Sequence, residues 1–100
     1  MFFKNETLQQ QFDHWMVKLN NEGGYGIKLG YGQKTPHTYT IGKKYIKVIQ
    51  AIGGTQYSVL AFVDGDGNIY KPAGWEKPSK YIRGHLWDEK LPLVYGDLYA

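Results

Sequence analysis

The fold of this chain is decided by residues 43–84, which read KKYIKVIQAIGGTQYSVLAFVDGDGNIYKPAGWEKPSKYIRG. Two stretches in it, 45–50 and 57–63, are rich in the β-branched and aromatic residues that favour strands. The sequence DGDG at 64–67 signals a turn, because Gly and Asp tolerate positive φ. Residues 68–71 then return as a third short strand. The short connections predict an antiparallel meander.

Helical spacing appears on either side of these strands. Residues 5–20 are predicted to form an amphipathic helix, because apolar residues line one face of it: Leu8, Phe12, Trp15, Met16 and Leu19. Two N-terminal caps are open, either Asn5 or a capping box of Thr7 with Gln10. A short second helix is predicted over residues 79–86, where Lys80 and Arg83 are three apart and would share a face.

The remaining segments complete an α+β prediction. Residues 25–31 alternate apolar side chains with Gly and Lys, which favours an edge strand or a mobile ribbon, and residues 39–41 resume a strand. Residues 51–56 are predicted to form a turn. The aromatic C-terminal tail is expected to pack back on the domain. We therefore expect one domain over residues 1–100: an N-terminal helix packed on a small antiparallel three- or four-stranded sheet, with a short second helix.

Composition narrows the function classes. The 100 residues include no Cys, which excludes disulfides, thiolate nucleophiles and Cys-based zinc sites. No apolar run approaches the roughly 20 residues that a membrane span needs. The start, Met-Phe-Phe-Lys, is too short and too soon charged for a secretory signal. We expect a soluble intracellular protein without a membrane partner.

The net charge of +3 hides a basic middle between acidic ends. Residues 25–83 hold nine basic against three acidic residues, a net of +6, whereas residues 1–24 net −1 and residues 84–100 net −2. This asymmetry indicates an anionic partner, of which nucleic acid is the commonest.

Basic and aromatic side chains alternate in that middle segment. Lys and Arg neutralise phosphates, and Tyr and Trp offer flat rings on which bases stack. The predicted nucleic-acid-binding residues are Lys43, Lys44, Lys47, Tyr70, Lys71, Trp75, Lys77, Lys80 and Arg83. The competing interpretation is that these lysines only solvate an ordinary surface while the aromatics belong to the core.

Other chemistry finds little support. Residues 64–68 resemble the start of a calcium loop, but Ile69 and Trp75 stand where that loop needs Gly and Glu, so a plain hairpin turn is expected. The glycines of residues 24–32 are not followed by the Lys of a phosphate loop. No sequence pattern groups the three histidines, His14, His37 and His85, with a carboxylate. We expect no metal, no cofactor and no enzymatic activity.

Residues 58–84 resemble a known group of proteins, and this resemblance implies where the protein acts. The runs SVLAFVD (58–64) and GNIYKPAGWEKPSKYIRG (67–84) resemble a group of small, largely uncharacterised proteins encoded by tailed bacteriophages, and the likeness extends to residues 44–48 and 94–96. It implies a phage origin and a place in the host bacterial cytoplasm or the virion. The positions that match its signature are Tyr70, Lys71, Trp75, Lys77, Lys80 and Arg83.

Two functions from different classes are therefore carried forward. The first is a small phage-type accessory protein that binds nucleic acid with little sequence preference. The alternative is a protein–protein module, either an inhibitor or anti-defence protein acting on a host factor or a minor virion component, since Tyr, Trp and Arg dominate binding hot spots. An exposed edge strand at 25–31 would also permit a homodimer.

Overall fold

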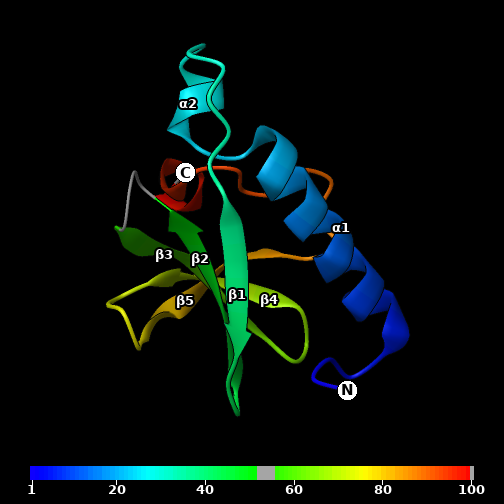
Figure 1. Ribbon diagram of the computed structural model, residues 1–100. Helices are drawn as coiled ribbons and strands as arrows, with labels where there is room; N and C mark the ends of the chain where they lie inside the picture. Colours follow the sequence, from blue (N-terminus) through cyan, green and yellow to red (C-terminus); the bar gives the residue numbers. More distant parts are fainter. Residues whose placement is uncertain (52–55, 100) are drawn as a thin grey trace.

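A computed structural model describes residues 1–51 and 56–99 (Figure 1). Its elements in chain order are α1 (Glu6–Glu22), α2 (Tyr25–Lys28), β1 (His37–Ile41), β2 (Tyr45–Ala51), β3 (Tyr57–Asp64), β4 (Asn68–Pro72), β5 (Pro78–His85) and the 3-10 helix η1 (Tyr95–Tyr99). The strands form one antiparallel sheet in the order β1-β2-β3-β4-β5, and α1 covers one face. The predicted α+β class is confirmed, and the sheet has five strands rather than three or four.

Helix α1 begins and ends for identifiable reasons. The side chain of Asn5 accepts a hydrogen bond from the Leu8 N–H at 2.9 Å, so Asn5 is the N-terminal cap. The Gly23 N–H closes the other end on the Leu19 carbonyl at 2.8 Å. The predicted apolar face is confirmed, because the same five side chains are buried: Leu8, Phe12, Trp15, Met16 and Leu19.

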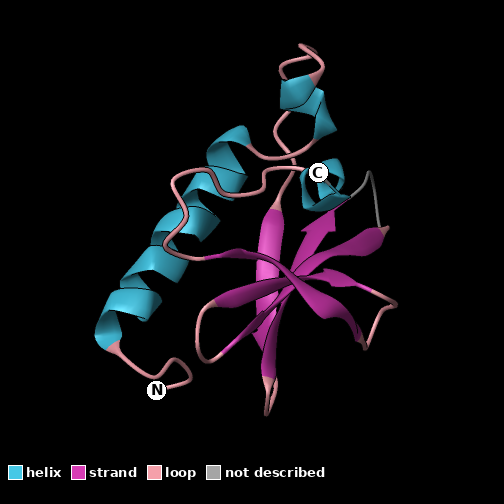
Figure 2. Cartoon of the chain, turned by 180° about the vertical axis from the view of Figure 1, so that it is seen from behind, coloured by secondary structure: helices cyan, strands magenta, loops and turns pink. Residues whose placement is uncertain are grey.

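The core lies between α1 and the sheet. Ile46 of β2 and Val63 of β3 belong to the same buried cluster as the apolar face of α1. The indole N–H of the fully buried Trp15 donates to the Pro92 carbonyl at 2.9 Å. The segment after β5 runs along α1 before it reaches η1 (Figure 2). Leu98 completes the core, which confirms that the tail packs back on the domain.

Strand β3 is buried on both of its faces. The register of β2 and β3 shifts between Val48 and Ile49, because Leu60 is an extra residue in β3. Residues 59–63 are all shielded from solvent. Phe62 lies on the outer face, the face of the sheet opposite α1, where Tyr45 packs edge-on against it with ring centroids 6.1 Å apart. The outer face is therefore partly apolar, and the site described below is built over it.

The helix predicted over residues 79–86 is wrong. This segment is β5, which pairs with β4 through Ile69 opposite Gly84 and Tyr70 opposite Ile82. The three-residue spacing of basic side chains fits a helix, but the segment is short and contains a Tyr-Ile pair that favours a strand. Pairing with a preformed hairpin edge outweighs a weak helical preference.

The strand predicted over residues 25–31 is also wrong. Residues 25–28 form α2, and the chain reverses on both sides of it at Gly24 and Gly30, where φ is 96° and 83°. The Tyr25 hydroxyl accepts a hydrogen bond from the Gly96 N–H at 3.1 Å, which ties α2 to η1. The short second helix therefore lies at residues 25–28 and not at residues 79–86. The edge strand at residues 25–31, from which a possible homodimer was predicted, does not form.

The two remaining predicted segments differ in outcome. Residues 39–41 belong to β1, so the strand predicted there is confirmed. The turn predicted over residues 51–56 falls mainly on residues 52–55, which lie outside the described residues.

Candidate nucleic-acid interface

Lys47 organises the outer face of the sheet. Its side chain points from the middle of β2 and is only 12% exposed. The ammonium donates to the Glu76 carboxylate at 2.8 Å and lies 4.6 Å from the centroid of the Trp75 ring. These contacts hold the β4–β5 loop over β2. Because the Lys47 ammonium is already paired with Glu76 and Trp75, this residue supports the site and does not contact a phosphate.

Trp75 is the exposed ring of the site. It is 49% exposed although the Lys47 ammonium lies against it. Its loop is closed by two hydrogen bonds to the Lys77 carbonyl, from the Ala73 N–H at 2.8 Å and the Gly74 N–H at 3.1 Å. A fixed and half-exposed indole is a suitable surface for a nucleic-acid base to stack on.

The β1–β2 turn carries two lysines whose charges are free. Lys43 and Lys44 form the β1–β2 turn, which the Gly42 N–H closes on the Tyr45 carbonyl at 2.9 Å. Both side chains are exposed, and neither makes an ion pair with any residue that the structure describes. They line one hollow of about 200 Å³ together with Lys47 and Glu76. The structure thus brings Lys43, Lys44 and Lys47 to one hollow, and Lys47 also contacts Trp75.

Tyr70 has a structural role at the edge of this group. Its hydroxyl donates to the Asp64 carboxylate at 2.7 Å, and its ring packs edge-on against Tyr45. Burial, with the hydrogen bond to Asp64 and the charge of that carboxylate, raises the pKa of Tyr70 to about 12. The hydroxyl is committed within the fold, and the ring supports the sheet surface.

Asp64 closes the β3–β4 hairpin. Its carboxylate accepts hydrogen bonds from the backbone N–H groups of Asp66 at 3.0 Å and Asn68 at 2.9 Å, and from the Asn68 side chain at 3.0 Å. Burial alone would raise the pKa of Asp64, but the hydrogen bonds from Tyr70, Asn68 and Asp66 outweigh it, so the pKa lies below its ordinary value. The plain hairpin turn predicted here is confirmed.

The predicted surface is divided. Lys77 in the β4–β5 loop and Lys80 on β5 are exposed, and Lys71 on β4 is half-buried. Arg83 lies elsewhere, because it lines a hollow with Lys18 and Glu22 of α1. The prediction that Lys80 and Arg83 share a helix face fails with the helix itself, and Arg83 does not belong to the group around Trp75.

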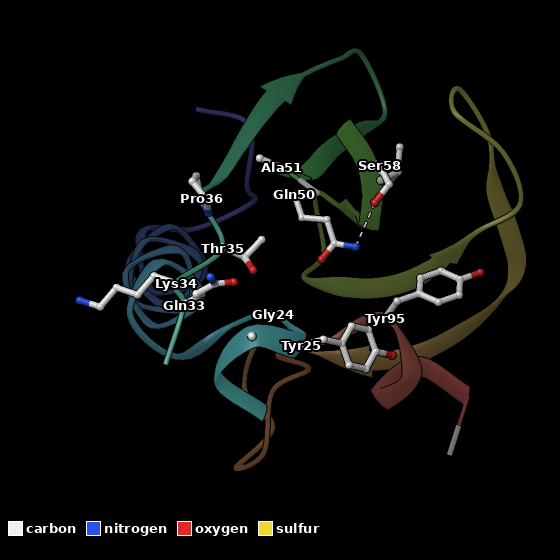
Figure 3. A pocket seen from close by; sticks show the side chains of 12 residues that line it. Gly24, Tyr25, Gln33, Lys34, Thr35, Pro36, Gln50, Ala51, Ser58 and Tyr95 are labelled. Carbon is white, nitrogen blue, oxygen red and sulfur yellow. Dashed lines mark hydrogen bonds between the residues drawn. The ribbon is translucent and has the colours of Figure 1, made fainter. Parts of the chain in front are cut away.

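Sequence reasoning missed a groove that continues from Trp75 toward α2. A hollow of about 890 Å³ lies at the end of the sheet between α2, residues 33–36 and η1 (Figure 3). It shares Ser58, Val59 and Tyr95 with a second hollow of about 340 Å³, whose wall includes Trp75. Glu76, the next residue, lines the hollow of Lys43 and Lys44.

We call these three hollows the groove: the first two share part of their walls, and the third is related to them through the neighbouring residues Trp75 and Glu76. Its walls carry exposed or half-buried rings and the two free lysines: Tyr25, Tyr57, Tyr95, Trp75, Lys43 and Lys44. No local sequence signal marks the three tyrosines, because they come from α2, β3 and η1 and meet only through the tertiary fold.

Comparison with known proteins gives a family but no activity. Residues 3–94 match a family described as "Family of unknown function (DUF7717)", and the chain belongs to that family. No curated protein and no solved structure matches the chain. The function is therefore argued from the groove itself.

Two further observations concern residues 1–51 and 56–99. No helix in this part of the chain is long and apolar enough to cross a membrane. No three His, Asp or Glu side chains of these residues come together as a metal site requires.

Proposed function

We propose that the protein binds single-stranded nucleic acid along the groove, with little sequence preference. The observation that carries this proposal is the half-exposed Trp75, held by Lys47, which itself lines one hollow with the free cations Lys43 and Lys44. The proposal includes the phage setting and the host cytoplasm or virion that the resemblance of residues 58–84 implies.

The chemistry of the groove favours a single strand over a duplex. Bases in a duplex stack on one another, so an exposed indole can stack only on a base that is unpaired. Such stacking contributes about 1–3 kcal/mol for each base and tolerates any sequence, because every base has a flat face. The lysines of the β1–β2 turn would add phosphate contacts that carry no sequence information.

The test compares two matched charge reversals. K43E/K44E alters the groove, whereas K18E/K90E alters the hollow beside α1; each takes the net charge from +3 to −1, since every Lys→Glu substitution removes two charges. Affinity for a labelled mixed-sequence single strand is measured by fluorescence anisotropy over a salt series, after thermal unfolding has shown that both variants fold.

We expect K43E/K44E to weaken binding about tenfold or more and to reduce the slope of log affinity against log salt by roughly 1.4, which corresponds to two phosphate contacts. K18E/K90E should change the slope far less. Equal losses in the two variants, or no detectable binding by the natural sequence at low salt, would refute the proposal. A duplex of the same sequence should bind more weakly than the single strand.

A second candidate function is recognition of a protein partner by β5. This strand is the last in the sheet and, among the described residues, pairs with β4 alone; Tyr81 on it is 69% exposed. An unpaired edge with an exposed aromatic ring suits the addition of a partner's strand. Tyr81→Glu would then abolish capture of a defined host protein while leaving oligonucleotide binding unchanged; the reverse result favours the groove.

A further inference from the structure

We propose that the large hollow at the α2 end of the groove is a pocket for one nucleobase, extruded from the bound strand and held by Gln50. This inference rests on the proposed function, because it assigns a ligand to one part of the same groove. The hollow, about 890 Å³, falls within the roughly 300–1,000 Å³ of small-molecule pockets. Its wall is assembled from α2, residues 33–36, the ends of β2 and β3, and η1.

The corner of the sheet at this pocket is unusually polar. Among the described residues, the buried polar or charged side chains are His37, 7% exposed, and Gln50, 8% exposed. The two residues are cross-strand partners at the pocket end of β1 and β2. A buried polar side chain costs free energy unless it is hydrogen-bonded, and an apolar residue would fill position 50 without that cost. The Gln50 carboxamide is thus a polar group that needs hydrogen-bond partners in this corner.

Gln50 is held in position for such a role. Its Nε2 donates to the Ser58 hydroxyl at 3.0 Å. The carboxamide points into the open middle of the pocket, between Thr35 on one side and the rings of Tyr25 and Tyr95 on the other (Figure 3). One amide hydrogen is used by Ser58, which leaves a second donor and the carbonyl acceptor of the same planar group.

The pocket chemistry selects a neutral, flat ligand. Among the described lining residues there is no carboxylate, and the Lys34 side chain extends away from the pocket (Figure 3). A planar group with one donor and one acceptor matches the edge of a nucleobase, which is how Gln contacts adenine. The tyrosine rings supply apolar, stackable surface for the base. The sugar and phosphate would remain in the groove, toward Trp75.

The first experiment uses free nucleosides as probes. Each of the four is titrated into ¹⁵N-labelled protein, and the side-chain amide resonances of Gln50 are followed. We expect at least one nucleoside to shift these resonances in a saturable manner. Gln50→Leu should weaken its affinity roughly fivefold or more, as the loss of a paired amide contact requires. Gln33→Leu is the control, because Gln33 also lines the pocket but is exposed. No saturable shift with any nucleoside, or equal losses in both variants, would overturn the pocket.

The second experiment separates the pocket from the groove. Homopolymer single strands are bound to Gln50→Leu and to K43E/K44E. We expect Gln50→Leu to narrow the affinity differences among the four homopolymers while the slope of log affinity against log salt stays the same. We expect K43E/K44E to reduce that slope while the differences among the homopolymers stay the same. If strands bind with an unaltered base preference in Gln50→Leu, the pocket proposal fails and the groove stands. If nucleosides bind but strands do not, the groove proposal fails.

Discussion

The Lys47 ammonium lies 2.8 Å from the Glu76 carboxylate, although the two residues are 29 positions apart in the chain. The same ammonium lies 4.6 Å from the centroid of Trp75. One largely covered lysine thus contacts both the indole and the loop that carries it. Lys47 would in this way support the proposed nucleic-acid site without contacting a phosphate.

Removing that ammonium should loosen the β4–β5 loop. Lys47→Met keeps most of the apolar stem and loses the charge. We expect faster amide exchange over residues 73–77 and about threefold or greater loss of oligonucleotide affinity, because Trp75 is no longer fixed. The free energy of unfolding should fall by no more than about 1 kcal/mol, since Glu76 is exposed to solvent. Lys80→Met, at an exposed position on β5, is the control; an equal effect there contradicts the positioning role of Lys47.

The exposed indole itself can be tested against a matched tryptophan. Trp75 and Trp87 are 49% and 53% exposed, but Trp87 stacks on His85, outside the groove. We expect Trp75→Ala to weaken single-strand binding by about 1–3 kcal/mol, close to the value of one base–aromatic stack. Trp87→Ala should leave binding nearly unchanged. The affinity of each variant for the single strand is measured by fluorescence anisotropy at one fixed salt concentration. Comparable losses of affinity in both variants would show that Trp75 is not part of the site.

The carboxylates of Asp64 and Asp97 predict an acid-sensitive fold. Burial would raise the pKa of each, but hydrogen bonds from neighbouring N–H groups, joined at Asp64 by the Tyr70 hydroxyl and at Asp97 by Lys28, lower both below the ordinary 3.8. Between the folded and unfolded pKa values the unfolded chain binds more protons, so the free energy of unfolding rises with pH. This stabilisation is present above pH 3.8 and is lost as the pH falls through the folded pKa values.

Asp64→Asn should therefore flatten the acid limb of a stability profile measured by denaturant unfolding. It should also bring the pKa of Tyr70 down from about 12 toward its ordinary 10, because the carboxylate charge is gone. Ultraviolet absorbance of the phenolate reports the second effect. Asp13→Asn, at an exposed position on α1, is the control. A Tyr70 titration that Asp64→Asn leaves in place would disprove the coupling.

His37 predicts a second pH effect. Its Nδ1 lies 2.7 Å from the Thr35 carbonyl, and its buried Nε2 has no partner among the described residues. Burial lowers the pKa of His37 below 6.5, although the Thr35 hydrogen bond opposes the shift. The unfolded chain then binds more protons just below pH 6.5, so stability falls as the pH decreases through that range. His37→Gln should reduce this fall, whereas His14→Gln, at an exposed position on α1, should not; the same profile in both would exclude His37 as its source.

The sequence was sufficient where a regular period coincided with local turn chemistry. The apolar stripe of α1 and the hairpin closed by Asp64 are both local features, and both are confirmed. The sequence was insufficient where the decisive contacts are distant. Residues 78–85 form a strand because they pair with β4. Residues 25–28 form the helix α2, which the contact of Tyr25 with Gly96 holds in place. Short segments have weak propensities, and tertiary contacts override them.

The same distinction holds for the site. The grouping of Lys43, Lys44 and Lys47 with Trp75 was predictable in part, because basic and aromatic residues are dense in that region. The separation of Arg83 from this group was not predicted, because the incorrect helix prediction placed Arg83 on the same face as Lys80. The pocket around Gln50 was not predictable, since a lone Gln in an apolar strand has no motif, and its neighbours come from four other segments.

The contact of Trp15 with Pro92, and the presence of Phe3 and Leu98 in one core cluster, have a consequence for biosynthesis. Residues near both ends of the described chain must therefore be present before the hydrophobic core is complete. While the ribosome is still translating, α1 and the meander can form but leave an open apolar seam. The core is complete only after residue 98 has left the ribosome, and until then exposed apolar side chains favour aggregation of the nascent chain.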